Sequence, residues 1–230
     1  MLHSPNFSIS REAKNLGIRV ICMVVSDLQN ASYIPEFDII RQEYMGHLRS
    51  TLSSMDCIKH DPVLAGFRAL HDKVGRSNKK YPSSPESLIR LFFAKGIVPQ
   101  INPVVDIYNI VSLDTRLSLG AHDVDRVSGN IVLRMTNGSE RFVPLGSSIP
   151  VPVSSGEYCY IDDSNDVLCM LEHKQCEKTK IGRNTRSCFL IVQGNEATSP
   201  KFLEESAARL SWMLARFCSG LVTKIWDETN

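Results

Sequence analysis

Apolar and polar positions in the first hundred residues recur mainly with the period of a helix. Ile18–Val25 is the exception, because it is a continuous, mostly β-branched run that predicts one buried strand. Helical spacing covers residues 37–52, a segment from Asp61-Pro62 to Gly75, and a segment from a Ser84 N-cap to Gly96. This half of the chain is therefore predicted to be largely helical.

From about residue 101 the pattern changes. A short helix is predicted over Val104–Leu113, and strand-length runs separated by turn signals such as Asn137-Gly138 follow it. The predicted strands are residues 131–135, 141–144, 157–161, 167–171 and 187–192. We expect the last element to be a helix that Ser199 caps and Ser219-Gly220 ends. Such a series is typical of an antiparallel or barrel-like sheet with helices packed against it.

Composition narrows the class of protein. The chain has 230 residues, 43% of them hydrophobic, and 26 basic against 25 acidic side chains, which excludes a mainly disordered state. A net charge of +1 gives no overall attraction to nucleic acid, so any RNA contact must come from local basic patches. No apolar run reaches membrane-helix length, and the N-terminus lacks a secretory pattern. We expect a cytoplasmic protein whose seven cysteines are free thiols.

An ordered series of motifs carries a family resemblance. The motifs are YPSSPESLIR (81–90), NPVVDIYNIVSL (102–113), LGAHDVDRVSGNIVLRM (119–135), SGEYCYID (155–162) and EKTKIGRNTRSCFLIV (177–192). Together they resemble the B3/B4 domain of the phenylalanyl-tRNA synthetase beta subunit, and more closely the free-standing proteins of that family. The resemblance implies an α+β fold, with a β-barrel or layered sheet flanked by helices. We divide the chain into an N-terminal extension (1–60) packed on a B3/B4-like domain (61–230).

The resemblance also implies a function. In the synthetase this domain hydrolyses tRNA misacylated with tyrosine, so we expect tRNA binding and editing of aminoacyl-tRNA in trans. Two positions depart from the synthetase pocket: Gly120 stands at the position of its His, and Ile191 at that of its Glu. The run Leu171–Cys176 also lacks two tryptophans that free-standing members carry. The tyrosine specificity is therefore not carried over.

Candidate catalytic residues follow from the chemistry of ester hydrolysis, which needs a positioned water and hydrogen-bond donors. His122 can relay a proton, and the neighbouring carboxylate of Asp123 is expected to raise its proton affinity. The alternative is that Asp123 only braces a turn. Gln175 and Thr179 are assigned to the ester or the terminal ribose solely because they lie in the family's most patterned loop.

The same loop is basic. Its lysines and arginine are candidates for phosphate contacts, although a solvated loop is an equally good interpretation. These candidates are Lys174, Lys178, Lys180 and Arg183. Asn109 belongs to a polar stripe of the predicted 104–113 helix. It either hydrogen-bonds to neighbouring backbone in a structural role or forms part of the pocket wall.

Other classes find little support in the sequence. Cys169 and Cys176 lack the second ligand pair of a zinc site, and nucleotide-binding motifs are missing, so we expect no metal, no cofactor and no synthetase activity. The rival hypothesis is a non-catalytic module that binds an amino acid or small metabolite in the same pocket. The oligomeric state is left open.

Overall fold

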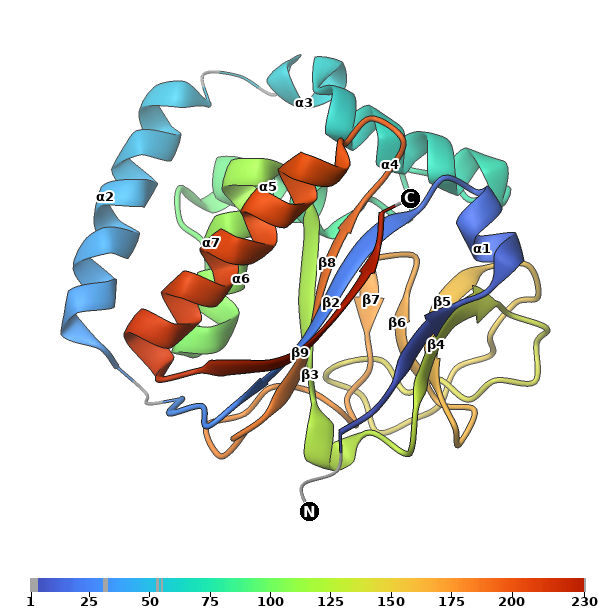
Figure 1. The fold of residues 1–230 in the computed structure, drawn as a ribbon. Helices are drawn as coiled ribbons and strands as arrows, with labels where there is room; N and C mark the ends of the chain where they lie inside the picture. The colour runs from blue at the N-terminus through green and yellow to red at the C-terminus, as the bar shows by residue number, and fades with distance from the viewer. Residues whose placement is uncertain (1–3, 31–32, 53, 55, 230) are drawn as a thin grey trace.

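Two open β-sheets stack face to face, and helices cover the outer face of one of them (Figure 1). The computed structural model describes residues 4–30, 33–52, 54 and 56–229. Sheet A has the order β1 (Phe7–Ile9), β4 (Ile131–Met135), β5 (Tyr158–Asp162), β6 (Val167–Met170), β7 (Lys174–Gln175). Sheet B is antiparallel, with the order β3 (Ser118–Asp123), β8 (Cys188–Gly194), β2 (Arg19–Ser26), β9 (Leu221–Glu228).

Helices supply the third layer and the upper rim of the molecule. They are α1 (Arg11–Asn15), α2 (Pro35–Thr51), α3 (Asp56–His60), α4 (Pro62–Lys73), α5 (Ser84–Lys95), α6 (Pro103–Thr115) and α7 (Pro200–Cys218), with a 3₁₀ turn η1 (Val124–Arg126). Helices α6 and α7 lie on sheet B, and α2 packs outside them through a ring contact of Phe37 with Phe217 (Figure 1).

Strand β2 explains why its sequence reads as a continuous apolar run. Ile21 and Met23 face α6 and α7, whereas Val20 and Cys22 face sheet A. Because successive side chains of a strand point to opposite faces, a strand buried on both sides must be apolar throughout. The strand predicted at Ile18–Val25 is thereby confirmed, and it lies between β8 and β9 inside sheet B. The predicted N-terminal extension and the main segment therefore share one core.

Helix termini follow the predicted signals closely. The Ser199 hydroxyl accepts a hydrogen bond from the Phe202 N–H, and Ser219 ends α7 in the left-handed conformation. Gly96 ends α5 in the same conformation. Ser84, however, is the first residue of α5, and Ser83 occupies the cap position.

The structure corrects the prediction at several strands. The chain does not end in a helix, because β9 follows α7. Strands β1 and β3 were also not predicted. β1 has only three residues, and Gly120 interrupts the apolar sequence pattern of β3. The run 141–144 forms only isolated bridges. The α+β layered arrangement is confirmed, and neither sheet closes into a barrel across the described residues.

Two helical glycines should respond oppositely to alanine. A Cβ on Gly66 of α4 would lie 2.0 Å from Oδ1 of buried Asn195, which is fixed by hydrogen bonds to Val63 and Ala197. Gly66→Ala should therefore lower the free energy of unfolding by about 1–3 kcal/mol. Gly46→Ala on α2, where the described atoms leave open space, should raise it by about 0.5–1 kcal/mol. Urea unfolding of both variants checks this; a stabilised Gly66→Ala protein would contradict the packing.

Candidate functional site

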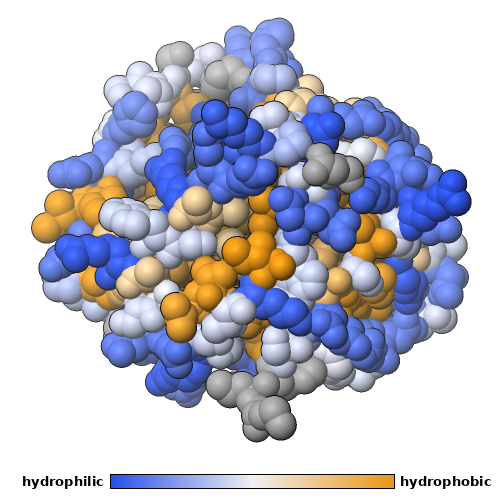
Figure 2. Space-filling model, in the orientation of Figure 1, coloured by the Kyte–Doolittle hydropathy of each residue, from blue (hydrophilic) through white to orange (hydrophobic). Residues whose placement is uncertain are grey.

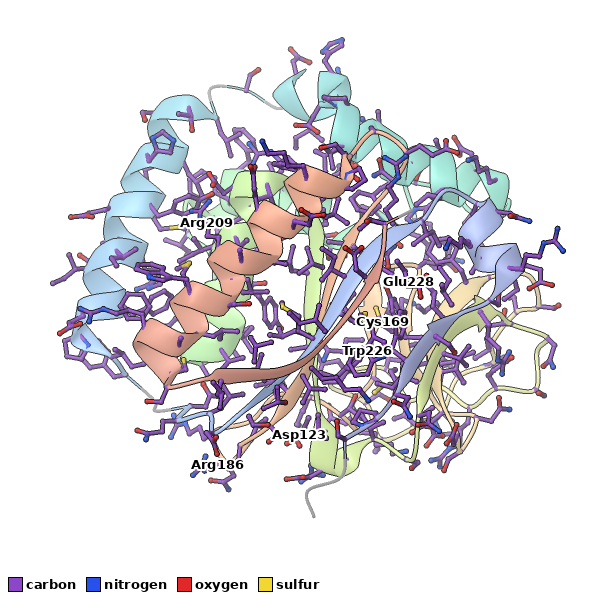
Figure 3. The ribbon with its side chains drawn as sticks, in the orientation of Figure 1. Asp123, Cys169, Arg186, Arg209, Trp226 and Glu228 are labelled. Atoms are coloured by element: carbon purple, nitrogen blue, oxygen red, sulfur yellow. The ribbon has the colours of Figure 1, made fainter. Side chains whose placement is uncertain are left out.

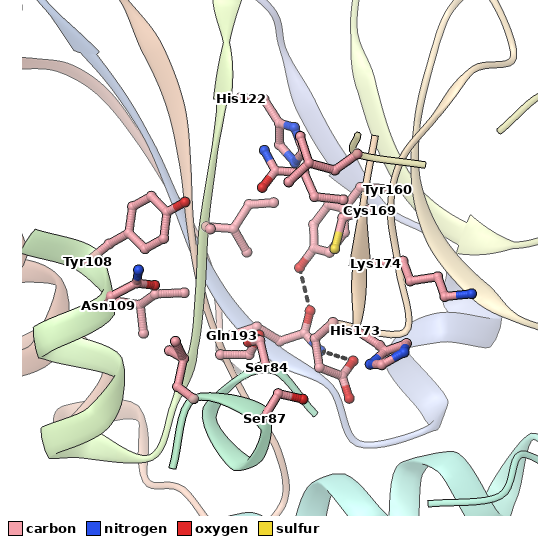
Figure 4. Close-up of a pocket in the computed structure, with 18 of the residues that line it drawn as sticks. Ser84, Ser87, Tyr108, Asn109, His122, Tyr160, Cys169, His173, Lys174 and Gln193 are labelled. Atoms are coloured by element: carbon pink, nitrogen blue, oxygen red, sulfur yellow. Dashed lines mark hydrogen bonds between the residues drawn. The ribbon is translucent and has the colours of Figure 1, made fainter. Parts of the chain in front are cut away.

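A cavity of about 470 Å³ opens between the two sheets, beside the β3 edge of sheet B (Figure 4). Helices α5 and α6 close one side of it, and β7 with its flanking residues closes the other. Its walls are mainly apolar, and they include Leu88, Leu91, Leu119, Leu145 and Ile191. A concave site with apolar walls and a few polar groups is the usual form of a small-ligand pocket.

The polar base of the cavity is built on Glu172. Its Oε1 accepts hydrogen bonds from the Tyr158 hydroxyl (2.9 Å) and from Nε2 of His71 (2.8 Å), and its Oε2 accepts one from Nε2 of Gln193 (3.0 Å). The Tyr160 hydroxyl in turn donates to Oε1 of Gln193 (2.7 Å; Figure 4). Glu172 as a whole is 4% exposed. A buried charge is tolerated because three donors satisfy it.

Backbone strain and shifted pKa values accompany this network. Leu171 and Glu172 both have positive φ, at 51° and 38°, which turns the Glu172 side chain inward after β6. Burial alone lowers the pKa of His71, but its hydrogen bond to Glu172 and that residue's charge outweigh burial, and the net pKa is raised. Burial, together with the Glu172 charge, raises the pKa of Tyr158 well above its usual value. The tyrosine therefore stays a hydrogen-bond donor at neutral pH.

The two positions that depart from the synthetase pocket are neighbours. Gly120 on β3 and Ile191 on β8 are directly paired across sheet B, and both line the cavity. The wall at this point is consequently apolar, with no ionisable side chain from either position.

His122 lies in the cavity wall two residues along β3 from Gly120. It is 1% exposed, and its Nδ1 lies 2.7 Å from the Thr179 hydroxyl oxygen. Burial lowers the pKa of His122 to about 4, so the imidazole is neutral at physiological pH. The expectation that Asp123 raises this proton affinity is wrong. Adjacent residues of a strand point to opposite faces, and Asp123 instead accepts hydrogen bonds from Thr185 and Asp125.

Two further predicted residues reach the cavity. Nε2 of Gln175 on β7 donates to the Ala121 carbonyl of β3 (2.7 Å), which links the two sheets at the cavity edge. Asn109 lines the cavity from α6, and its amide makes no side-chain hydrogen bond within residues 4–30, 33–52, 54 and 56–229. The Asn109 amide is therefore available to hydrogen-bond a ligand in the cavity.

The four basic residues of the predicted loop lie in different environments. Nζ of Lys178 is held by Asp162 (2.7 Å), Asp166 (2.8 Å) and the Ser128 hydroxyl (2.9 Å), outside the cavity lining. Lys180 pairs with Glu177. Arg183 is exposed and does not line the cavity. Lys174 alone of these four reaches the cavity edge.

Lys174 belongs to a basic rim, which we define as Lys80, Tyr81, His173 and Lys174. The Nζ atoms of Lys80 and Lys174 lie 5.4 and 5.6 Å from the centroid of the Tyr81 ring. His173 contacts the edge of that ring, and its Nδ1 donates to the Pro82 carbonyl (2.7 Å). His173 and Lys174 line the cavity, and the rim places a second ammonium group, that of Lys80, over the same Tyr81 ring.

Sequence reasoning missed the network and every member of the rim except Lys174. Glu172 and Gln193 are polar residues next to apolar strand runs, which is the signal that would mark them as buried and functional. His71 and Tyr81 come from distant segments and carry no comparable signal. Lys80 belongs to a short basic stretch with Arg76 and Lys79, a pattern that is typical of a solvated loop. No group of three or more potential metal-binding side chains occurs in the part of the chain that the structure describes. Nor is any described helix long and apolar enough to span a membrane.

The match to a known family falls on the segment that builds this cavity. The model of the B3/4 domain matches residues 68–218, which include α5, α6, β3, β7 and β8. The chain belongs to the B3/4 domain family. The resemblance seen in the sequence is thereby confirmed, and strands β1, β2 and β9 of this B3/4 protein lie outside the matched segment.

Two relatives belong to phenylalanyl-tRNA synthetases. The phenylalanine–tRNA ligase beta subunit of Fusobacterium nucleatum is 29% identical over 115 residues, which are 50% of this chain and 14% of that protein. A crystal structure of an N-terminal fragment of the phenylalanyl-tRNA synthetase beta subunit from Pyrococcus horikoshii matches 97% of this chain and 50% of its own, with a TM-score of 0.46 and 13% identity. The B3/4 protein thus spans half or less of each relative.

Removing the buried carboxylate should destabilise the fold. Glu172→Ala leaves His71, Tyr158 and Gln193 without their acceptor, and we expect a loss of about 3–5 kcal/mol in the free energy of unfolding. Glu177→Ala, just beyond β7, removes a carboxylate whose contacts with Lys180 and the Gly146 N–H are exposed; it is the matched control and should leave stability nearly unchanged. Denaturant titrations measure both, and equal effects would show that the network contributes little.

Proposed function

We propose that this B3/4 protein binds the 3′ end of an aminoacyl-tRNA in the cytoplasm and hydrolyses a wrong aminoacyl ester in trans. The observation that carries the proposal is the apolar cavity with a neutral histidine in its wall and a basic rim at its mouth. An aminoacyl-adenosine end has the matching parts: an amino-acid side chain, an ester, and phosphates that follow the ribose.

The proposed chemistry uses water as the nucleophile. Neutral His122 accepts a proton from the attacking water, and the Thr179 hydroxyl holds the ring through its contact with Nδ1. Gln175 and Asn109 offer hydrogen bonds to the ester and ribose from opposite sides of the cavity. The ester carbon accepts the hydroxide, the tetrahedral intermediate collapses, and the ribose hydroxyl leaves with the proton.

A second candidate function is a non-catalytic module that holds an amino acid or small metabolite. The paired Gly120 and Ile191 favour it, because they leave the wall apolar at the positions where the resemblance implies functional side chains. The cavity could then bind a ligand without reacting with it.

A deacylation assay separates the two functions. A panel of correctly and wrongly charged tRNAs, beginning with tyrosine on phenylalanine tRNA, is incubated with the protein, and release of the amino acid is followed. We expect hydrolysis of a mischarged species, with a loss of about 100-fold or more in His122→Gln. Because the folded pKa of His122 is about 4, the rate should be constant above about pH 5.5 and fall only toward pH 4.

The controls for this assay keep the outcomes distinct. His47→Gln on α2 should retain full activity, and circular dichroism checks that His122→Gln is folded. An acid limb near pH 6.5, the ordinary range of histidine, would contradict the role of His122. Absence of hydrolysis across the panel, with binding of a free amino acid, would establish the second function.

The basic rim should determine how binding depends on salt. Lys80→Ala with Lys174→Ala removes both ammonium groups of the rim, and each lost phosphate contact should reduce the slope of log K against log salt by about 0.7. Lys201→Ala, a single exposed lysine on α7, is the control and should leave affinity and slope nearly unchanged. Filter binding to tRNA at several salt concentrations measures both; an unchanged slope in the double variant removes the rim from the interface.

A further inference from the structure

Strand β9 forms an unpaired edge of sheet B. It hydrogen-bonds to β2 on one side and to no described strand on the other. Leu221 and Ile225 on this strand are 59% and 60% exposed. Figure 2 shows a stripe of hydrophobic residues across this face of the molecule, where Figure 1 places β9. An exposed backbone edge beside apolar side chains is a template for pairing with another strand.

The usual protections of an edge strand are weak here. β9 has eight residues and no proline, and its single irregularity is a bulge opposite Val24 and Val25. Beyond the bulge, residues 224–228 pair regularly with β2. The one lysine in this stretch, Lys224, lies 4.5 Å over the ring of Trp226 and bonds to Asn6 of the N-terminal segment. Its ammonium group is therefore held toward sheet A, where Trp226 and Glu228 also lie (Figure 3).

We propose that a second copy of this chain covers the edge, through antiparallel pairing of β9 with β9 across a two-fold axis. With Trp226 at the axis, Lys224 of each copy stands opposite Glu228 of the other, and Ile225 stands opposite Asp227. No like charges face each other in this register. The two Ile225 side chains take diagonal positions, within reach of each other.

The charges make 224–228 complementary to itself, which is what a two-fold interface requires. Shifting the axis to Lys224 would instead set the two lysines opposite each other, which is destabilising. In the favoured register the two copies of sheet B become one continuous sheet.

Helix α7 extends the apolar surface beside the edge. After the turn at 219–220, β9 runs back along α7 in the opposite direction (Figure 1). Trp212 precedes Leu221 by nine residues, or ~14 Å of helix, and Ile225 follows it by four, or ~13 Å of strand. Trp212, which is 62% exposed, therefore lies at a level similar to that of Ile225.

The test is the mass of the purified protein in solution, by size exclusion with light scattering at about 50 μM chain. We expect twice the 25.8 kDa of one chain. Ile225→Lys should reduce the mass to that of one chain, whereas Ile149→Lys, at an isoleucine that is even more exposed and lies outside β9, should not. Both positions are on the surface, so thermal unfolding should show that each variant remains folded.

Charge reversal tests the register. Lys224→Glu places like charges opposite each other and should separate the copies; Lys224→Glu combined with Glu228→Lys should restore the doubled mass. A wild-type protein of single mass would overturn the proposal. So would a doubled mass that Ile225→Lys leaves unchanged, or a double reversal that stays dissociated.

Discussion

A buried carboxylate requires hydrogen-bond donors, and in this protein the donors of Glu172 come from both sheets and a helix. Tyr158 belongs to sheet A, Gln193 to sheet B and His71 to α4, while the Glu172 carbonyl accepts the N–H of Ser84 at the start of α5. Because leaving any of these groups unpaired is costly, the layers are held at one separation. The cavity exists where that separation leaves space beside β3.

The same constraint decides what chemistry the cavity can offer. With its acceptor sites largely occupied, Glu172 is better suited to shape the base than to react, and the wall formed by Gly120 and Ile191 is apolar. Burial keeps His122 neutral, and the amide of Asn109 makes no side-chain hydrogen bond to any described residue, so the proposed function assigns the reaction to these two side chains. In the proposed function, contacts with phosphate are assigned to the basic rim, because Lys178 is engaged by Asp162 and Asp166.

Local patterns predicted most of the helices and the buried strands, because caps such as Ser199 and a doubly buried run such as Ile18–Val25 leave their mark within a few residues. Strand β9 was not predicted because only one of its faces packs against the protein. Strand β3 was not predicted because Gly120 breaks its apolar pattern. The site was predicted less well: His122, Gln175 and Lys174 do line the cavity, but Thr179, Asp123 and Lys178 do not. Their orientation depends on strand alternation and on distant ion-pair partners, which spacing along the chain does not encode.

The central claim is that the cavity receives an aminoacyl-adenosine end. Titration of the ¹⁵N-labelled protein with a non-hydrolysable 3′-aminoacylamino analogue of adenosine, followed by NMR, tests it most directly. We expect saturable shifts centred on Gly120, Ile191 and Gln193, with the Asn109 side-chain signals among them. Adenosine alone should shift fewer of these signals. Shifts confined to other surfaces, or none at millimolar analogue, would contradict it.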